Sequence, residues 1–204
     1  MLKKLAFLLV FSAVNSQVFS SESDKNKLQE KLAQLQSFSA SFEQIVSDVA
    51  GETLQTAQGK LYLQQPQKLY WESFEPNEMQ LIADGETLWH IDPFVEQVIA
   101  INQADAAQNH PIMLLADQQS AMWQNYLVEE TAKSQFKMLS LLPDSDFLSL
   151  TLVFESDRLT QLTIVDKMEQ RNHLTFSSVE QNQTIPASLF QFDLPDGYEL
   201  DDQR

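Results

Sequence analysis

The chain has 204 residues, and its 13 Lys and Arg against 29 Asp and Glu give a formal net charge of −16. This length suits one domain or a small pair, and a hydrophobic fraction of 43% is sufficient for a buried core. The acidity argues against nucleic-acid binding, because such a surface repels phosphate. The sequence has no cysteine, which excludes disulfides, thiolate metal sites and cysteine nucleophiles.

Residues 1–20 have the pattern of a secretory signal peptide. Lysines at positions 3 and 4 precede an apolar run over 5–14, which is too short to span a bilayer. We expect cleavage near Ser20, so that residues 21–204 form a single domain in the periplasm, where export does not require disulfides. Loss of both lysines makes the mature chain still more acidic, as expected for a soluble monomer without stable membrane insertion.

One amphipathic helix is expected at the start of this domain. Leu28, Leu32 and Leu35 form an apolar stripe at helical spacing within residues 23–36. From Phe38 onward the apolar pattern becomes an alternation, which is typical of half-buried strands. Turn signals such as Asp84-Gly85 divide it into about eleven strands. Among the expected strands are 54–64, 147–155, 158–166 and 190–194.

The alternation is interrupted between residues 104 and 124. Pro111 suits the first turn of a helix, and residues 112–116 are apolar on every side. A second short helix is expected near 118–124. A sheet of about eleven strands should curl, and its concave side is where such helices can bury their apolar residues. The predicted fold is therefore mainly β, an unclosed antiparallel β-barrel with a helical lid over a hydrophobic concave face.

Residues typical of catalysis are few. His90, His110 and His173 are too widely spaced for a helical metal site, and we expect them to face solvent or to be incidental. No nucleophile motif, dinucleotide fingerprint or phosphate-binding loop is present. We therefore expect no enzyme activity, no metal and no cofactor. A hydrolase on an open barrel stays as an alternative, since sequence does not reveal carboxylates paired in space.

Apolar side chains of the helix, the strands and the lid have positions that suit the lining of a cavity. These candidate residues are Leu32, Leu35, Leu69, Trp71, Leu81, Trp89, Ile112, Met113 and Leu115. The filling of an ordinary core would produce the same pattern. The pattern alone therefore leaves both interpretations open.

Several segments together resemble a known family, the periplasmic outer-membrane lipoprotein carriers (LolA family). The segments share the family's order and spacing over essentially the whole chain, and they are Ser37–Gln44, Gly59–Leu63, Asp84–Trp89, Asp92–Gln97, His110–Ala116, Phe190-x-Phe192 and Asp201–Gln203. The resemblance implies an eleven-stranded unclosed barrel, with His110–Ala116 as part of its lid.

The resemblance also implies a function and partners. A carrier of this family receives acylated lipoproteins from the inner-membrane ABC transporter LolCDE, shields their acyl chains in a hydrophobic cavity and passes them to the outer-membrane receptor LolB. The energy comes from the transporter's ATP, which fits the missing nucleotide motif. The alternative is a periplasmic lipid-binding or ligand-sensing module of the same fold, which would bind lipid without supplying a receptor.

One departure from the family concerns the lid. The family commonly has an Arg immediately before Pro66, and that Arg holds the lid by hydrogen bonds; this chain has Gln65. A neutral hydrogen bond contributes about 0.5–1.5 kcal/mol, against about 1.5–3 for a charged donor. The resemblance therefore implies that Gln65 is a weaker lid latch.

Overall fold

Twelve strands form one sheet in the computed structural model, which describes residues 16–106 and 110–204. The strands are β1 (Ser37–Ser47), β2 (Thr53–Gln64), β3 (Lys68–Ser73), β4 (Met79–Ala83), β5 (Thr87–Asp92), β6 (Gln97–Asn102), β7 (Tyr126–Ala132), β8 (Gln135–Ser140), β9 (Phe147–Glu155), β10 (Arg158–Asp166), β11 (Arg171–Gln181) and β12 (Glu199–Asp202). Their order across the sheet is β12-β6-β5-β4-β3-β2-β1-β11-β10-β9-β8-β7.

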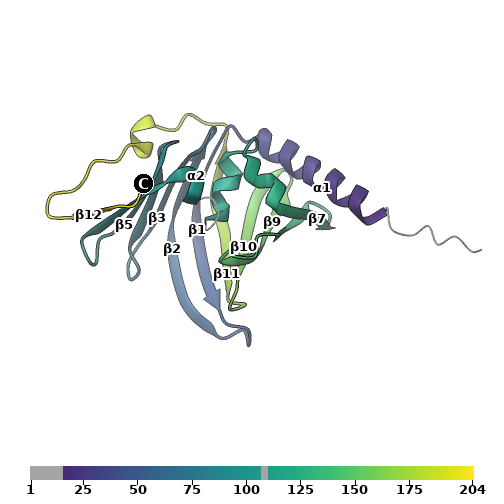
Figure 1. Ribbon diagram of the computed structural model, residues 1–204, viewed down its shortest axis with the longest axis horizontal. Coiled ribbons are helices and arrows are strands. Elements are labelled where there is room, and N and C mark those ends of the chain that lie inside the picture. Colours follow the sequence, from purple (N-terminus) through teal and green to yellow (C-terminus); the bar gives the residue numbers. More distant parts are fainter. Residues whose placement is uncertain (1–15, 107–109) are drawn as a thin grey trace, which may run out of the picture.

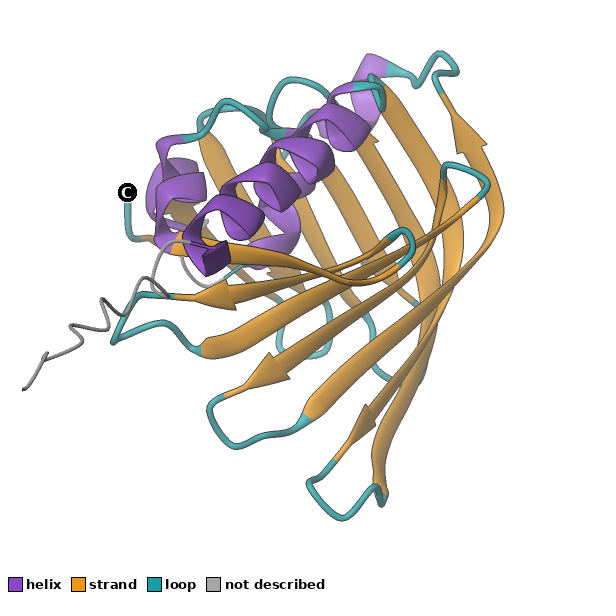
Figure 2. Ribbon diagram, turned by 90° about the vertical axis from the view of Figure 1, so that its right-hand side faces the viewer, coloured by secondary structure: helices purple, strands orange, loops and turns teal. Residues whose placement is uncertain are grey.

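The sheet curls strongly but does not close, as Figure 2 shows. Its two edge strands, β12 and β7, each pair on one side only. Neighbouring strands are antiparallel except for β12, which runs parallel to β6. The expected mainly β, unclosed barrel is thus confirmed, with twelve strands in place of about eleven.

The long hairpin of β1 and β2 lies near the middle of the sheet. Its turn contains Gly51 at φ 85°, a left-handed conformation that favours glycine. Gly59 of β2 is required for a different reason: a Cβ atom there would lie 2.0 Å from the carbonyl oxygen of Glu72 and 2.4 Å from the ring of Phe42. The absence of a side chain lets the Phe42 ring pack against Trp71, with ring centroids 4.2 Å apart.

Five helical segments accompany the sheet among the described residues. They are α1 (Ser16–Ala33), α2 (Gln103–Ala106) and the 3-10 helices η1 (Pro111–Ala116), η2 (Ala121–Asn125) and η3 (Ala187–Phe190). Figure 1 shows α1 beside β7. Leu28 and Leu32 of α1 are fully buried, while the Asp24 carboxylate accepts the backbone N–H of Glu130 at 3.1 Å. The helix thus covers part of the β7 edge.

The first helix differs from the expected 23–36. Its described part runs from Ser16 to Ala33. It ends at Ala33 because the chain turns there, so that Leu35 reaches the core and the backbone N–H of Gln36 donates to Asn182 at 2.8 Å. Of the expected signal peptide, residues 1–15 lie outside the described residues. Removal of residues 1–20 therefore stays a prediction, as does the single mature domain.

Buried residues form two clusters on opposite faces of the sheet. The larger fills the concave side, and the smaller, on the outer face, consists of Ile82, Ile91 and Val98 with partly buried aromatic neighbours. The C-terminal segment covers the smaller cluster, where Phe192 stacks on Trp89 with ring centroids 4.4 Å apart.

The expected strand at 190–194 is wrong. Residues 187–190 form η3, and the chain pairs with β6 only at β12. The Phe192 side chain packs against the outer face of the sheet, so its alternation with Phe190 reflects packing and not strand pairing.

Candidate functional site

The short helix η1 lies inside the curl of the sheet. All six of its residues, Pro111 to Ala116, are buried, and the large ones belong to the concave cluster. A helix that is apolar on every side requires apolar surroundings on every side. The helix expected as a lid therefore packs into the concave side, where its apolar residues were expected to be buried.

Eight of the nine candidate cavity residues come together in this cluster. They are Leu32, Leu35, Leu69, Trp71, Leu81, Ile112, Met113 and Leu115. Each is buried, with at most 8% of its surface exposed. The structure thus brings these side chains into one apolar interior, and their role in binding acyl chains stays a prediction.

Trp89 does not belong to this interior, so its expected place in the cavity is corrected. It pairs with Ile82 in the register of β4 and β5, and both side chains lie in the outer cluster. The next residue, His90, pairs with Leu81 and lines the interior. Because side chains alternate along a strand, Trp89 and His90 cannot both face inward.

A cavity of about 260 Å³ lies between the start of η1 and the concave face. Apolar side chains such as Trp71, Leu81 and Ile112 share its lining with the polar residues His90, His110, Gln44 and Asn172. Two of the three histidines therefore line the cavity, contrary to expectation. The parity of β5, on which Leu88 and His90 share a face, was the signal that could have placed His90 there.

The polar side chains of this cavity are neutral or paired. Burial, followed by the nearby His90, lowers the pKa of His110, and burial also lowers that of His90. Gln44 donates a 2.9 Å hydrogen bond to Asn172. Neutral imidazoles cost less to desolvate than charged ones, so the lining is compatible with an apolar or mildly polar ligand.

The buried helix η1 occupies much of the interior, and the cavity beside it is small. Pockets that enclose a drug-sized ligand measure about 300–1,000 Å³, and this cavity of about 260 Å³ is smaller. Several acyl chains would therefore fit only if η1 moved out of the interior.

Gln65 and Gln67 hold the two helical parts that border the interior. The Gln65 side chain donates to the carbonyl oxygens of Leu32 and Leu35, at 2.8 and 2.6 Å, at the end of α1. Gln67 holds the end of η1, since its backbone N–H donates to Ala116 at 2.9 Å and its amide to Asp117 at 2.7 Å. Within the described chain, the β2–β3 turn thus bonds to the lid helix through Gln67, and the expected latch Gln65 bonds to the end of α1 instead.

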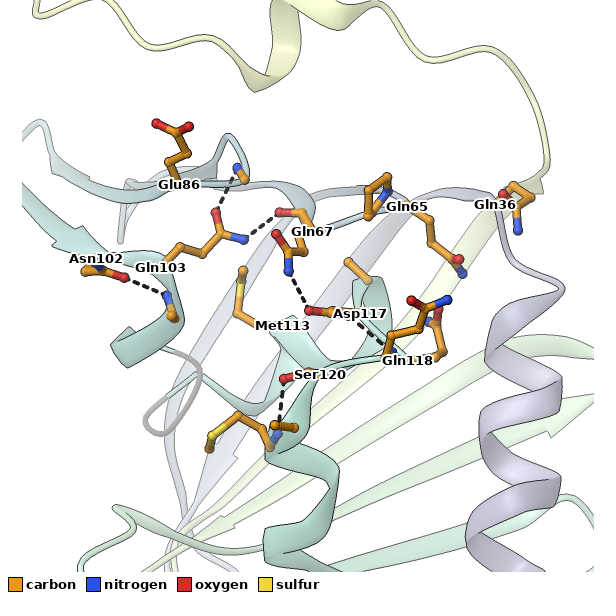
Figure 3. Close-up of a pocket in the computed structure, with 17 residues that line it drawn as sticks. Gln36, Gln65, Gln67, Glu86, Asn102, Gln103, Met113, Asp117, Gln118 and Ser120 are labelled. Atoms are coloured by element: carbon orange, nitrogen blue, oxygen red, sulfur yellow. Dashed lines mark hydrogen bonds between the residues drawn. The ribbon is translucent and has the colours of Figure 1, made fainter.

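A second, larger hollow of about 1060 Å³ opens beside the other end of η1 (Figure 3). The β2–β3 turn, the β4–β5 turn, α2 and the segment after η1 surround it. Gln103 ties three of these together: its amide donates to the carbonyl oxygen of Gln67 at 2.7 Å and accepts the N–H of Gly85 at 2.9 Å. The rim of this hollow is therefore held by side-chain amides.

The described part of the chain offers neither a metal site nor a membrane-spanning helix. Over residues 16–106 and 110–204, no three acidic or histidine side chains gather where they could hold a metal ion. No helix among the described elements has the length and apolarity needed to cross a membrane.

The fold and the site together define a class of mainly β proteins, in which a curled, unclosed sheet holds a short helix in its apolar interior. The family model described as outer membrane lipoprotein carrier protein LolA matches residues 33–193, and the chain belongs to this family. This confirms the resemblance found in the sequence.

Individual relatives agree with the family. The chain is 39% identical over 204 residues to a protein of Idiomarina loihiensis named outer-membrane lipoprotein carrier protein, with 99% of this chain and 100% of the relative covered. It is 35% identical over 206 residues to a protein of the same name from Klebsiella pneumoniae, with both chains fully covered. The fold is similar to an uncharacterized conserved protein of Thermus thermophilus, with a TM-score of 0.50 at 12% identity, covering 90% of this chain and 99% of that one.

Proposed function

We propose that this protein carries acylated lipoproteins through the periplasm. It receives them from an inner-membrane transporter of the LolCDE type, shields their acyl chains inside the curled sheet and delivers them to an outer-membrane receptor of the LolB type. The observation that carries this proposal is η1, a wholly apolar helix buried inside the unclosed sheet of a lipoprotein-carrier family member.

Displacement of η1 supplies the binding surface. Its residues Ile112 to Leu115 contact the same cluster as Leu69, Trp71 and Leu81, so a lipid that enters would replace lid contacts with acyl contacts. The exchange is reversible because neither state leaves the interior exposed to water. Such a carrier needs no catalytic group, and its family membership supports transport and a periplasmic location.

The direct test is release of lipoprotein from spheroplasts or from transporter proteoliposomes, with and without the protein. We expect ATP-dependent appearance of a soluble one-to-one complex, which a LolB-type receptor then empties. The Leu81→Gln variant should release less lipoprotein, since Leu81 faces the interior. Gln80→Ala on the opposite face of β4 is the matched control and should behave as the wild type.

A second candidate function is a lipid-binding or ligand-sensing module. The cavity of about 260 Å³ under the closed lid, with two histidines in its lining, would suit a single small amphiphile. Binding of a fluorescent lipid without any release of lipoprotein from membranes would favour this candidate and contradict the carrier.

A further inference from the structure

The large hollow beside η1 is lined by many polar side chains, unlike the interior that the proposed carrier function uses. Its lining includes six glutamines, which are Gln36, Gln65, Gln67, Gln103, Gln118 and Gln119. Glu86 and Asp117 add two carboxylates, whereas the described residues of the lining include no Lys, Arg or His. A hollow of about 1060 Å³ with so many hydrogen-bonding side chains differs from the apolar interior, and it suits a ligand that carries polar groups.

Three of these glutamines already donate hydrogen bonds within the protein. The Gln65 amide donates to the end of α1, that of Gln67 to Asp117, and that of Gln118 to the carbonyl oxygen of Leu115 at 2.7 Å. The amide oxygens of these three accept no hydrogen bond from a described protein group, whereas that of Gln103 accepts from Gly85. The hollow therefore presents hydrogen-bond acceptors, which an incoming donor could satisfy.

The negative charge of the hollow also favours a ligand that donates hydrogen bonds. The Glu86 side chain is exposed and has no hydrogen bond or ion pair within the described chain, while Asp117 accepts from Gln67 and from the backbone N–H of Gln119 at 3.2 Å. Acceptors and negative charge together favour a ligand rich in N–H groups and positive charge. An extended polypeptide with basic side chains has this chemistry.

The lid helix separates this hollow from the apolar cavity. Pro111 and Ile112 line the inner cavity, whereas Met113 and Ala116 line the hollow. Movement of η1 would therefore join an apolar chamber to a polar one. A ligand that spans both must be apolar at one end and a hydrogen-bond donor at the other.

On this ground we infer that the hollow binds the peptide segment that follows the acylated end of the cargo, with a preference for basic segments. The inference rests on the proposed carrier function and adds a subsite to it. Acyl chains supply most of the affinity inside the sheet, and the peptide subsite adjusts it according to the first residues of the cargo.

Synthetic lipopeptides with one acyl group and different tails test the inference. We would measure the affinity of the protein for a probe with a four-Lys tail, one with a four-Glu tail and one with no peptide, at low and high salt. Exposed charge pairs contribute only a few-fold each. We expect about three- to tenfold tighter binding of the Lys tail than of the Glu tail at low salt, decreasing as salt rises.

Two charge-reversal variants locate the effect. Glu86→Lys should abolish most of the preference for the Lys tail and leave the affinity for the tail-free probe unchanged. Glu78→Lys is the matched control, because Glu78 is an equally exposed carboxylate on the β3–β4 turn, at the opposite end of the strands from the hollow. The control should keep the preference, although its net charge changes by the same amount.

Equal affinity for the two tails would overturn the inference. If all three acylated probes still bound, the proposed function would stand. An equal loss of preference in both variants would also overturn it, since the effect would then come from net charge and not from the hollow. Failure of every acylated probe to bind would overturn the proposed function, and this inference with it.

Discussion

Shortening the Leu114 side chain in the lid helix η1 tests most directly whether this helix competes with lipid for the interior. Leu114 is 1% exposed at the centre of η1. Replacement of a buried Leu by Ala costs about 2–5 kcal/mol, and this cost falls on the closed lid, since displacement of η1 breaks the same contacts. Each 1.4 kcal/mol corresponds to a tenfold change in an equilibrium. Leu114→Ala should therefore favour lid opening by at least about tenfold.

The expected result is tighter binding of a fluorescent fatty-acid analogue together with a lower free energy of unfolding in urea. Affinity rises because a larger fraction of the protein is open before the lipid arrives. Val98→Ala is the matched control: Val98 is fully buried, but in the outer cluster away from the lid. It should lower stability without a change in lipid affinity. If Leu114→Ala behaves as this control does, the lid does not compete with lipid and the reasoning is refuted.

Three further predictions concern stability. Gly59→Ala should cost about 3 kcal/mol or more in urea unfolding, because its Cβ would overlap the carbonyl oxygen of Glu72 and the ring of Phe42; near-wild-type stability would contradict that contact. Tyr126→Phe should leave stability unchanged or raise it by about 1 kcal/mol, since the buried Tyr126 hydroxyl has no partner within the described structure; a clear loss in thermal unfolding would show a partner that the structure lacks. Burial lowers the pKa of His110, so the folded state binds fewer protons than the unfolded one, and stability should fall as the pH drops below about 6.5. Urea unfolding at about pH 7.5 and about pH 5.5 should show a smaller difference for His110→Asn than for the wild type, and an equal difference would exclude His110 as its source.

Local patterns accounted for most of the fold. The expected strands 147–155 and 158–166 coincide with β9 and β10. Apolar and polar residues alternate along a half-buried strand, and strands of this length make the alternation easy to recognise. Gly51 and Gly85 marked hairpin turns that the structure contains, both at positive φ. Strand order follows chain order within β1–β6 and within β7–β11, since consecutive antiparallel strands joined by short turns are neighbours in space. The pairing of β1 with β11 joins these two runs, and chain order alone does not predict it.

The C-terminal segment shows where local patterns are insufficient. Glu199 to Asp202 carry three carboxylates and one apolar residue, a composition that does not indicate a strand. They pair with β6 because that strand would otherwise be an edge and because Phe192 stacks on Trp89. Both causes are contacts between residues far apart in the chain, so single-sequence reasoning could not detect them.

The site errors have a similar cause. Hydrophobicity alone would bury Trp89 in preference to His90, yet the sheet has apolar cover on both faces. The C-terminal segment covers Trp89, and the Cζ atom of Arg204 lies 5.2 Å from the centroid of the Trp89 ring. The resemblance likewise implied Gln65 as the latch of the lid, whereas the turn directs Gln65 to α1 and Gln67 to η1. The orientations of adjacent turn residues depend on backbone geometry, which sequence spacing does not fix.

The buried lid also explains how a carrier with an apolar interior could release its cargo. Each buried methylene contributes about 0.8 kcal/mol, so three acyl chains would gain on the order of 30 kcal/mol gross, beyond the ceiling of about 18–21 kcal/mol for non-covalent affinity. Ile112 to Leu115 are buried within the same interior, and at about 1.5–3 kcal/mol for each large side chain the lid contributes about 6–12 kcal/mol to the closed state. Entry of lipid must displace these contacts, which lowers net affinity by a similar amount. A receptor whose interior holds no such helix would then bind the same chains more favourably, and transfer toward it needs no further energy.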